Sequence, residues 1–305
     1  MEISLVIPLF NEEAVIPELI GRTLKSLQII TGDFEIILVD DGSSDHSLEL
    51  LMDHRKTDNR IKILQLSRNF GHPAAYTAGM GQAKGDFVGI MDGDLQDPPE
   101  LFSEMYALLS ENKADVVYGK RIQKMNFKGR SFLTHWFHKC FQKISGLEDI
   151  ENVGNFSMMN RTALNAMLAF SEKTRYLPGI RRFIGFKQEF VEYEREARQA
   201  GQSKMKLGQL ISLSSDAIFS FSKAPIRICL YIGIMGVLVF FLAGLYTLIA
   251  KIAGFAIPGW SSTLLSIYFL GSIQLTFLGV LGEYIYRIHK ESQKRPLFLI
   301  KAYYS

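Results

Sequence analysis

The sequence predicts an α/β fold in which helices cover both faces of a mostly parallel sheet, followed by two C-terminal membrane helices. Three observations predict it. Short apolar segments rich in Ile and Val alternate with amphipathic segments over roughly the first 120 residues. Polar side chains follow these apolar segments repeatedly. Two long apolar runs, residues 226–250 and 260–288, lie near the C-terminus.

Strands and helices are expected to alternate along the N-terminal part of the chain. The predicted strands, which are short apolar runs, are residues 3–10, 34–40, 61–67, 86–92 and 115–121. The predicted helices, which have apolar residues at helical spacing, are residues 12–28, 46–56, 72–84 and 98–111. This alternation favours crossover connections and therefore a parallel sheet.

Functional side chains are expected at one edge of this sheet. Each predicted strand ends in polar groups: Asn11 and Glu12, Asp40 and Asp41, Ser67 to Asn69, Asp92 and Asp94, and Lys120 and Arg121. In open parallel sheets, ligands bind at the carboxyl ends of the strands. Five polar strand ends at one edge indicate a binding site more strongly than any one of them.

Asp92 and Asp94 are the candidate metal ligands. One small residue separates them, so an extended chain presents both carboxylates on the same side, across a turn that Gly93 makes possible. With Gln96 as a neutral oxygen donor, they could hold Mg²⁺ or Mn²⁺. The alternative is a solvated turn in which Asp97 caps the helix beginning at residue 98. Asp97 is assigned to this capping role and left out of the metal site.

The acidic pair Asp40 and Asp41 is a candidate nucleotide-binding group. A carboxylate at this strand end could accept hydrogen bonds from the imide N–H of a uracil or from a ribose hydroxyl. Gly42 and the two serines after it make a turn that a nucleotide can approach. The alternative is an ordinary strand-to-helix turn.

The two apolar runs predict a membrane hairpin. Only Lys251 lies in the link between them, whereas Lys223 and Arg227 lie before or at the start of the first run. Four basic residues lie at or just beyond the end of the second run: Arg287, Lys290, Lys294 and Arg295. The positive-inside rule therefore predicts a cytosolic N-terminal domain and a cytosolic tail. The first residues lack a basic signal-peptide region, and two cysteines suggest no disulfide framework. The alternative to a membrane hairpin is a pair of buried core helices.

Within the second run, Glu283 is expected to form a local ion pair with Arg287, which lies four residues later on the same helix face.

A basic segment is expected to meet the membrane. Residues 120–143 contain seven Lys or Arg residues and no acid, with aromatic residues interleaved. An amphipathic helix over residues 131–144 would lie on anionic headgroups and bring Arg121, Lys128 and Arg130 near a lipid phosphate. The alternative is a solvated basic surface. A second amphipathic stretch, residues 206–224, is expected along the interface.

In order along the chain, "VIPLFNEE", "ILVDDGSSD", "LSRNFGH", "MDGDLQDPPE" and "VVYGKR" resemble the inverting family 2 glycosyltransferases of GT-A fold. The resemblance is to the branch that acts on polyprenyl phosphates, which includes dolichyl-phosphate mannose synthase and the bactoprenol glucosyltransferases. "GNFSMMNR", "YEREARQAGQSKMKL", the two apolar runs and the C-terminal segment extend it over nearly the whole chain.

The resemblance implies roles for individual residues. The metal on the donor pyrophosphate would be held by Asp92, Asp94 and Gln96. The nucleotide would be bound by Pro8, Phe10, Glu12, Asp40, Asp41 and Lys204. The acceptor phosphate would be bound by Arg121, Lys128, Arg130 and Ser131. A membrane-proximal segment containing Arg195, Arg198 and Ser203 would close over the donor.

The sequence departs from the family pattern in two motifs. Where the bacterial branch usually has Gly-Asp-Phe-Arg, with the Asp as a candidate base, this chain has Asn155 and Ser157. Met205 replaces a frequent aromatic residue. A lipid monophosphate has a second pKa near 6, so its oxygen is already ionised near neutral pH and needs no general base. Asn155 is therefore expected in a catalytic position as an orienting group.

The resemblance implies a membrane-bound, inverting, metal-dependent transferase. Its expected organisation is a GT-A domain over residues 1–205, an interface segment over 206–224, two transmembrane helices within 225–288 and a basic tail over 289–305. The expected reaction moves glucose from UDP-glucose to undecaprenyl phosphate at the cytosolic face of the inner membrane. Mannose, N-acetylglucosamine or aminoarabinose, and dolichyl phosphate, remain open.

Several partners and competing functions follow from this assignment. A separate flippase and a downstream transferase are expected, nucleic acid is not, and a homo-oligomer is possible. A processive polysaccharide synthase normally has more membrane helices and a Gln-x-x-Arg-Trp motif, which this chain lacks. A non-catalytic membrane sensor or scaffold is disfavoured because the predicted metal, nucleotide and phosphate ligands are all present.

Overall fold

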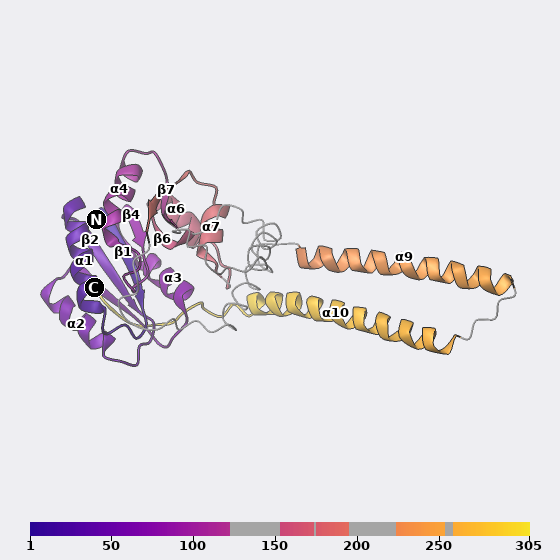
Figure 1. The fold of residues 1–305 in the computed structure, drawn as a ribbon. Helices are drawn as coiled ribbons and strands as arrows, with labels where there is room; N and C mark the ends of the chain where they lie inside the picture. Colours follow the sequence, from indigo (N-terminus) through magenta and orange to yellow (C-terminus); the bar gives the residue numbers. More distant parts are fainter. Residues whose placement is uncertain (123–152, 174, 195–223, 254–258) are drawn as a thin grey trace. The chain divides into compact units, whose positions relative to one another are not determined.

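The computed structural model describes residues 1–122, 153–173, 175–194, 224–253 and 259–305. These residues belong to two compact units. The first contains the described residues up to 194 together with residues 295–305, and the second contains residues 224–253 and 259–294. Both ends of the chain lie in the first unit (Figure 1).

Eight strands of the described chain form one sheet in the order β7-β5-β6-β4-β1-β2-β3-β8. The strands are β1 (Ile3–Leu9), β2 (Phe34–Asp40), β3 (Ile61–Leu66), β4 (Phe87–Ile90), β5 (Val116–Arg121), β6 (Val153–Asn160), β7 (Gln188–Tyr193) and β8 (Ile300–Tyr304). The first five lie where the sequence predicts them. Strand β1 pairs in parallel with β2 and β4, β2 with β3, and β5 with β7, while β6 and β8 run antiparallel to their neighbours.

Helices cover both faces of the sheet, as the sequence predicts. One face packs against α1 (Ile16–Ile30), α2 (Ser47–Thr57) and α4 (Phe102–Ser110), with the short helix η1 (Pro99–Leu101) leading into α4; the other packs against α3 (His72–Gln82), α6 (Arg161–Leu168) and α7 (Leu177–Phe183). Successive strand residues supply opposite faces: Leu5 belongs to one core cluster and Val6 to the other. The predicted fold class is therefore confirmed.

The strand directions bring many chain segments to one sheet edge. Because β5 and β7 run in the same direction as β1 to β4, all of these strands end there. Strands β6 and β8 are antiparallel and begin there. Strand β1 lies between β4 and β2. The chain leads from β1 to β2 on one side and from β4 toward β5 on the other. Open α/β sheets bind ligands at the point where neighbouring strands lead apart in this way.

The C-terminal strand β8 was missed by the sequence analysis, which predicted only a basic tail over residues 289–305. Ile300–Tyr304 pairs antiparallel with β3 and closes one end of the sheet. The backbone N–H of Ser67, just after β3, donates to the carbonyl of Leu299 at 2.9 Å. The segment after the second apolar run is thus part of the sheet-containing unit.

The second unit contains α9 (Ala224–Ile252) and α10 (Trp260–Ser292). Both are long and apolar enough to cross a membrane, with candidate spans at Cys229–Tyr246 and Phe269–Ser292. Only 6% and 0% of these windows are buried, which is unlike the core helices of the alternative interpretation. The predicted local pair is confirmed, because Arg287 Nε lies 2.9 Å from Glu283 Oε1.

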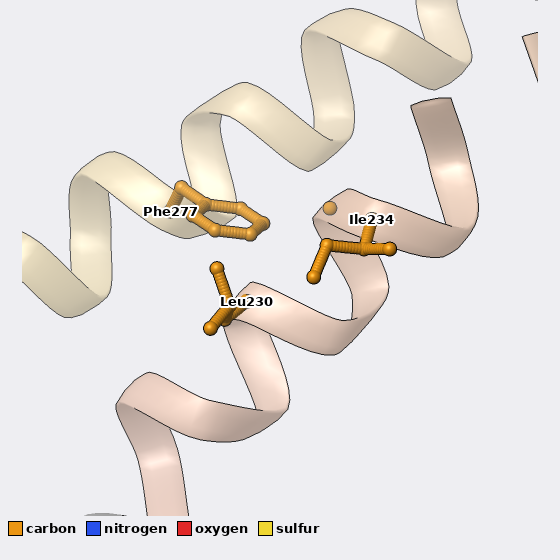
Figure 2. Close-up of a pocket in the computed structure, with 4 residues that line it drawn as sticks. Leu230, Ile234 and Phe277 are labelled. Atoms are coloured by element: carbon orange, nitrogen blue, oxygen red, sulfur yellow. The ribbon is translucent and has the colours of Figure 1, made fainter. Parts of the chain in front are cut away.

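A small groove lies between α9 and α10 (Figure 2). Leu230, Gly233, Ile234 and Phe277 line a volume of about 300 Å³. A Cβ on Gly233 would lie 3.3 Å from Phe277 Cζ, so the glycine leaves room for the ring. All four lining residues are apolar, and the groove therefore offers packing rather than catalytic groups.

Candidate functional site

The loops after the first four strands lie against one another at the sheet edge. The backbone N–H of Asp41 donates to the carbonyl of Leu9 at 2.9 Å. A Cβ on Gly93 would lie 2.4 Å from Leu9 Cδ2, and one on Gly42 would lie 2.6 Å from the backbone of Arg68. Gly42 also has a φ of +73°, a conformation that favours glycine. These two glycines let the polar strand ends come together.

Asp92 is held by a buried tyrosine. Tyr76, on α3, is fully buried, and its hydroxyl donates to Asp92 Oδ1 at 2.6 Å. Burial raises the pKa of Tyr76 well above its usual value, and the charge and hydrogen bond of Asp92 raise it further. The hydroxyl therefore stays protonated and orients the carboxylate, which remains partly exposed.

Asp94 lies in a strained turn. Its Oδ1 accepts the backbone N–H of Gln96 at 3.2 Å. The residue between them, Leu95, has a φ of +55°, which is rare for a residue with a Cβ and costs about 1 kcal/mol. The turn was predicted at Gly93, whereas the left-handed residue is Leu95 and Gly93 is needed for close packing. Burial of the Leu95 side chain offsets the strain.

The predicted metal ligands suit a hard divalent cation. Asp92 and Asp94 are partly exposed at the same strand end, and Gln96 is also partly exposed. Two carboxylates and an amide oxygen are ligands that Mg²⁺ and Mn²⁺ accept. No group of three or more His, Cys, Asp or Glu gathers as a metal cage within the described ranges. Two carboxylates and one amide oxygen leave coordination positions on such an ion for other ligands.

Asp97 does not cap a helix, so that prediction is wrong. Helix η1 begins without a side-chain cap. Asp97 is instead fully buried, and its Oδ1 accepts the hydroxyl of Tyr193 at 2.5 Å. Arg121 Nη2 lies 3.5 Å from the same oxygen. Buried carboxylates require such partners, because desolvation otherwise disfavours the charge.

Asp41 and Asp40 are both buried at the end of β2. The two oxygens of Asp41 accept the backbone N–H groups of Phe70 and Gly71 at 2.7 and 2.8 Å. Burial raises the pKa of Asp41, although these hydrogen bonds oppose the rise. Oδ1 of Asp40 accepts the N–H of Ser43 at 3.0 Å. Both acids thus order the loops around the predicted nucleotide site.

Three other predicted nucleotide residues lie in β1 or just after it. Pro8 is buried within the strand, whereas Phe10 and Glu12 are partly exposed beyond its end. Asn11, between them, has a φ of +54°, and its Oδ1 accepts the N–H of Ser44 at 2.8 Å. This contact joins the loops after β1 and β2.

Arg121 and Asn155 lie on neighbouring strands at the same edge. A Cβ on Gly154 would lie 2.8 Å from Arg121 Nη2, so the guanidinium lies against the start of β6 beside Asn155. Burial alone would lower the pKa of Arg121, but the Tyr193 hydroxyl and the charges of Asp97 and Asp92 raise it. The structure therefore brings Arg121 to the edge that carries the metal-ligand candidates.

Arg181, on α7, lies behind the same strand. It is buried, and its guanidinium donates to the carbonyl of Gly154 at 3.0 Å and to that of Asn155 at 3.5 Å. It also lies 5.2 Å from the ring of Tyr118. Burial lowers its pKa to about 10, so it is still charged near neutral pH. Arg181 fixes the backbone on which Asn155 is carried.

Several predicted residues lie outside the described part of the chain. These are the acceptor-phosphate candidates Lys128, Arg130 and Ser131, and the residues Arg195, Arg198, Ser203 and Lys204 of the closing segment. Described residues flank both regions: Arg121 precedes the first and Tyr193 the second.

Sequence reasoning missed Tyr76, Asp97, Tyr193 and Arg181 as members of the site. In the sequence, nothing distinguishes Tyr76 and Tyr193 from ordinary core aromatic residues. Only the packing shows where their hydroxyls point. A weak signal existed for Arg181, since "PGIRRFIGF" places two adjacent arginines in an apolar segment. Only one of them is buried, and sequence alone did not say which.

Comparison with known proteins identifies the family. The description "Glycosyl transferase family 2" matches residues 4–171. An uncharacterized glycosyltransferase of Synechocystis is 38% identical over 305 residues, covering 98% of this chain and 95% of the relative. The prophage bactoprenol glucosyl transferase homolog of Escherichia coli is 36% identical and covers 99% of both chains. The bactoprenol glucosyl transferase of Shigella phage SfV is also 36% identical, covering 99% of this chain and 98% of the relative.

A solved structure, glucosyl-3-phosphoglycerate synthase from Mycobacterium tuberculosis with Mn²⁺, UDP and phosphoglyceric acid, is 17% identical with a TM-score of 0.48, covering 71% of this chain and 76% of that one. The matched domain makes up more than half of this chain, and the relatives span nearly all of it. The chain therefore belongs to glycosyl transferase family 2, and the protein is a glycosyltransferase.

Proposed function

We propose that this protein transfers a sugar from a nucleotide sugar to the phosphate of a polyprenyl phosphate. UDP-glucose and undecaprenyl phosphate are the proposed substrates, and the reaction inverts the anomeric centre at the cytosolic face of the plasma membrane. The observation that carries the proposal is the pair of relatives named bactoprenol glucosyl transferases, which align with 99% of this chain. Helices α9 and α10 support it, since their length and composition suit a membrane anchor.

In the proposed reaction, an oxygen of the lipid phosphate bonds to the anomeric carbon as the bond to the nucleoside diphosphate breaks. The leaving group takes the bonding electrons. The acceptor phosphate is already ionised near neutral pH, so no proton has to be removed. This fits an amide, Asn155, rather than an acid at this position. Asn155 would orient the acceptor or the sugar by hydrogen bonding.

Other residues at the sheet edge would bind the metal, the acceptor phosphate and the nucleotide. Asp92, Asp94 and Gln96 would hold Mg²⁺ or Mn²⁺, which neutralises charge on the leaving diphosphate when bound. Tyr76 keeps the Asp92 carboxylate in one orientation. Arg121, on β5, would bind the acceptor phosphate, because a guanidinium can contact two phosphate oxygens at once. The loops ordered by Asp40 and Asp41 would bind the nucleotide.

A panel of sugar nucleotides tests the proposal. Membranes containing the protein are supplied with undecaprenyl phosphate, Mn²⁺ and each donor in turn, and lipid products are identified by mass spectrometry. The expected product is undecaprenyl phosphate carrying one hexose, formed best from UDP-glucose and absent with Asp94→Ala. Transfer from a different donor would change the proposed sugar. No lipid product from any donor would refute the lipid acceptor.

A further inference from the structure

Three buried or half-buried side chains form a closed polar triangle beside the metal-ligand candidates. Arg121 Nε donates to the hydroxyl of Tyr193 at 3.1 Å, and that hydroxyl donates to Asp97 Oδ1 at 2.5 Å. The 3.5 Å ion pair between Arg121 Nη2 and Asp97 closes the triangle. Successive hydrogen bonds polarise one another, so the tyrosine strengthens the link between the two charges.

The triangle is built into the sheet. Arg121 at the end of β5 is the register partner of Tyr193 at the end of β7. The Tyr193 ring packs edge-on against Phe156, with centroids 5.6 Å apart, and Phe156 packs against Phe102 in the same way at 5.1 Å. A Cβ on Gly119 would lie 2.7 Å from Tyr193 and 2.5 Å from Phe156. Gly119 therefore makes room for both rings, and this packing orients the Tyr193 side chain.

The triangle leaves part of Arg121 available to a ligand. A guanidinium has five N–H donors, and the hydrogen bonds from Arg121 to described residues use Nε and Nη2. Nη1 is not used by them. The side chain is 25% exposed, whereas the Asp97 side chain is completely buried. The arrangement thus anchors one edge of the guanidinium and presents the rest at the sheet edge.

We infer that Tyr193 and Asp97 are positioning residues that aim Arg121 at the acceptor phosphate. The inference rests on the proposed function, in which Arg121 binds that phosphate. Asp97 is three residues beyond Asp94, so the same contacts tie the phosphate-binding arginine to the loop of the metal-ligand candidates. The triangle fixes the spacing between the group that receives the acceptor and the groups that hold the donor.

Tyr193→Phe tests the inference. It removes the hydroxyl and keeps the ring against Phe156, so the fold should persist. Without the hydroxyl, Arg121 can swing away from its position, and we expect the KM for undecaprenyl phosphate to rise about tenfold. The KM for the sugar nucleotide and the thermal stabilisation by UDP with Mn²⁺ should stay near their wild-type values. Asp97→Asn keeps the shape of the side chain and should give the same pattern.

Tyr106→Phe is the matched control. The Tyr106 hydroxyl also donates to a carboxylate, Glu2 Oε1, but at the opposite edge of the sheet. The Tyr106→Phe substitution should leave the KM values for undecaprenyl phosphate and for the sugar nucleotide unchanged. An unchanged acceptor KM and kcat in both Tyr193→Phe and Asp97→Asn would overturn the inference, as would equal rises in the donor and acceptor KM. If the wild-type protein transfers no sugar to the lipid, the proposed function fails instead, so the two failures are distinguishable.

Discussion

Removing the Tyr76 hydroxyl should weaken metal use while leaving the fold intact. The ring of Tyr76 is fully buried in the core between α3 and the sheet, and Phe preserves that packing. Only the 2.6 Å hydrogen bond to Asp92 Oδ1 is lost. Asp92 is partly exposed, so water can replace the hydroxyl as a donor without fixing the carboxylate in one orientation.

The size of the effect follows from two independent magnitudes. A hydrogen bond to a charged group contributes about 1.5–3 kcal/mol net. Loss of a group that orients a metal ligand typically costs about 10- to 100-fold in metal affinity or activity, which corresponds to roughly 1.4–2.8 kcal/mol. Because Asp92 is partly exposed, the lower end applies. We therefore expect about a tenfold weaker half-saturation by Mn²⁺ in Tyr76→Phe.

The assay is sugar transfer measured over a range of Mn²⁺ concentrations with donor and acceptor saturating. Tyr106→Phe, which also loses a hydroxyl–carboxylate hydrogen bond, should titrate like the wild type. A Tyr76→Phe protein with the wild-type half-saturation would refute the role given to the hydroxyl. So would an equal shift in the control, because it would indicate a general effect of losing such a bond.

Three further predictions concern catalysis, packing and pH. Asp94→Ala should abolish nearly all sugar transfer, whereas Asn155→Asp should change the rate only modestly. Comparable losses of activity from both substitutions in a radiolabelled transfer assay would count against the roles proposed for them. Gly93→Ala should lower the free energy of unfolding by about 1–3 kcal/mol, because the added methyl group would lie 2.4 Å from Leu9 Cδ2 of β1. Denaturant titration measures this change, and an unchanged unfolding midpoint would contradict the expected clash. Burial would raise the pKa of Glu35, but hydrogen bonds and Lys62 lower it below its usual value, so the charged form stabilises the fold near neutral pH and this stabilisation is lost on acidification. Glu35→Gln should flatten this acid dependence, and an equal slope in both proteins would disprove the assignment.

The ends of the strands could be predicted from sequence because each depends on a few neighbouring residues. A short apolar run followed by an acid or an amide marks the end of a buried strand, and parallel topology brings such ends together. Asp41, Asp92 and Arg121 accordingly lie at the predicted edge. Strand β8 was missed because five residues, "IKAYY", carry little periodicity and pair with β3 from the far end of the chain.

The contacts that orient the site could not be predicted, because they depend on which side chains tertiary packing brings together. Tyr193 meets Asp97 across 96 positions of sequence and Arg121 across 72. Asp97 precedes a helix that begins with prolines, as capping residues often do, yet packing directs its buried carboxylate to Tyr193 and Arg121. The left-handed turn falls on Leu95 rather than Gly93 because core burial holds a leucine there while β1 excludes any Cβ at residue 93.

A structure of the protein with a UDP-sugar and Mn²⁺ would test the central claim most directly. We expect an ion in contact with the carboxylates of Asp92 and Asp94 and with the diphosphate, and Arg121 facing the anomeric carbon from the acceptor side. A well-ordered donor with both carboxylates turned away from the diphosphate and no ion between them would contradict it.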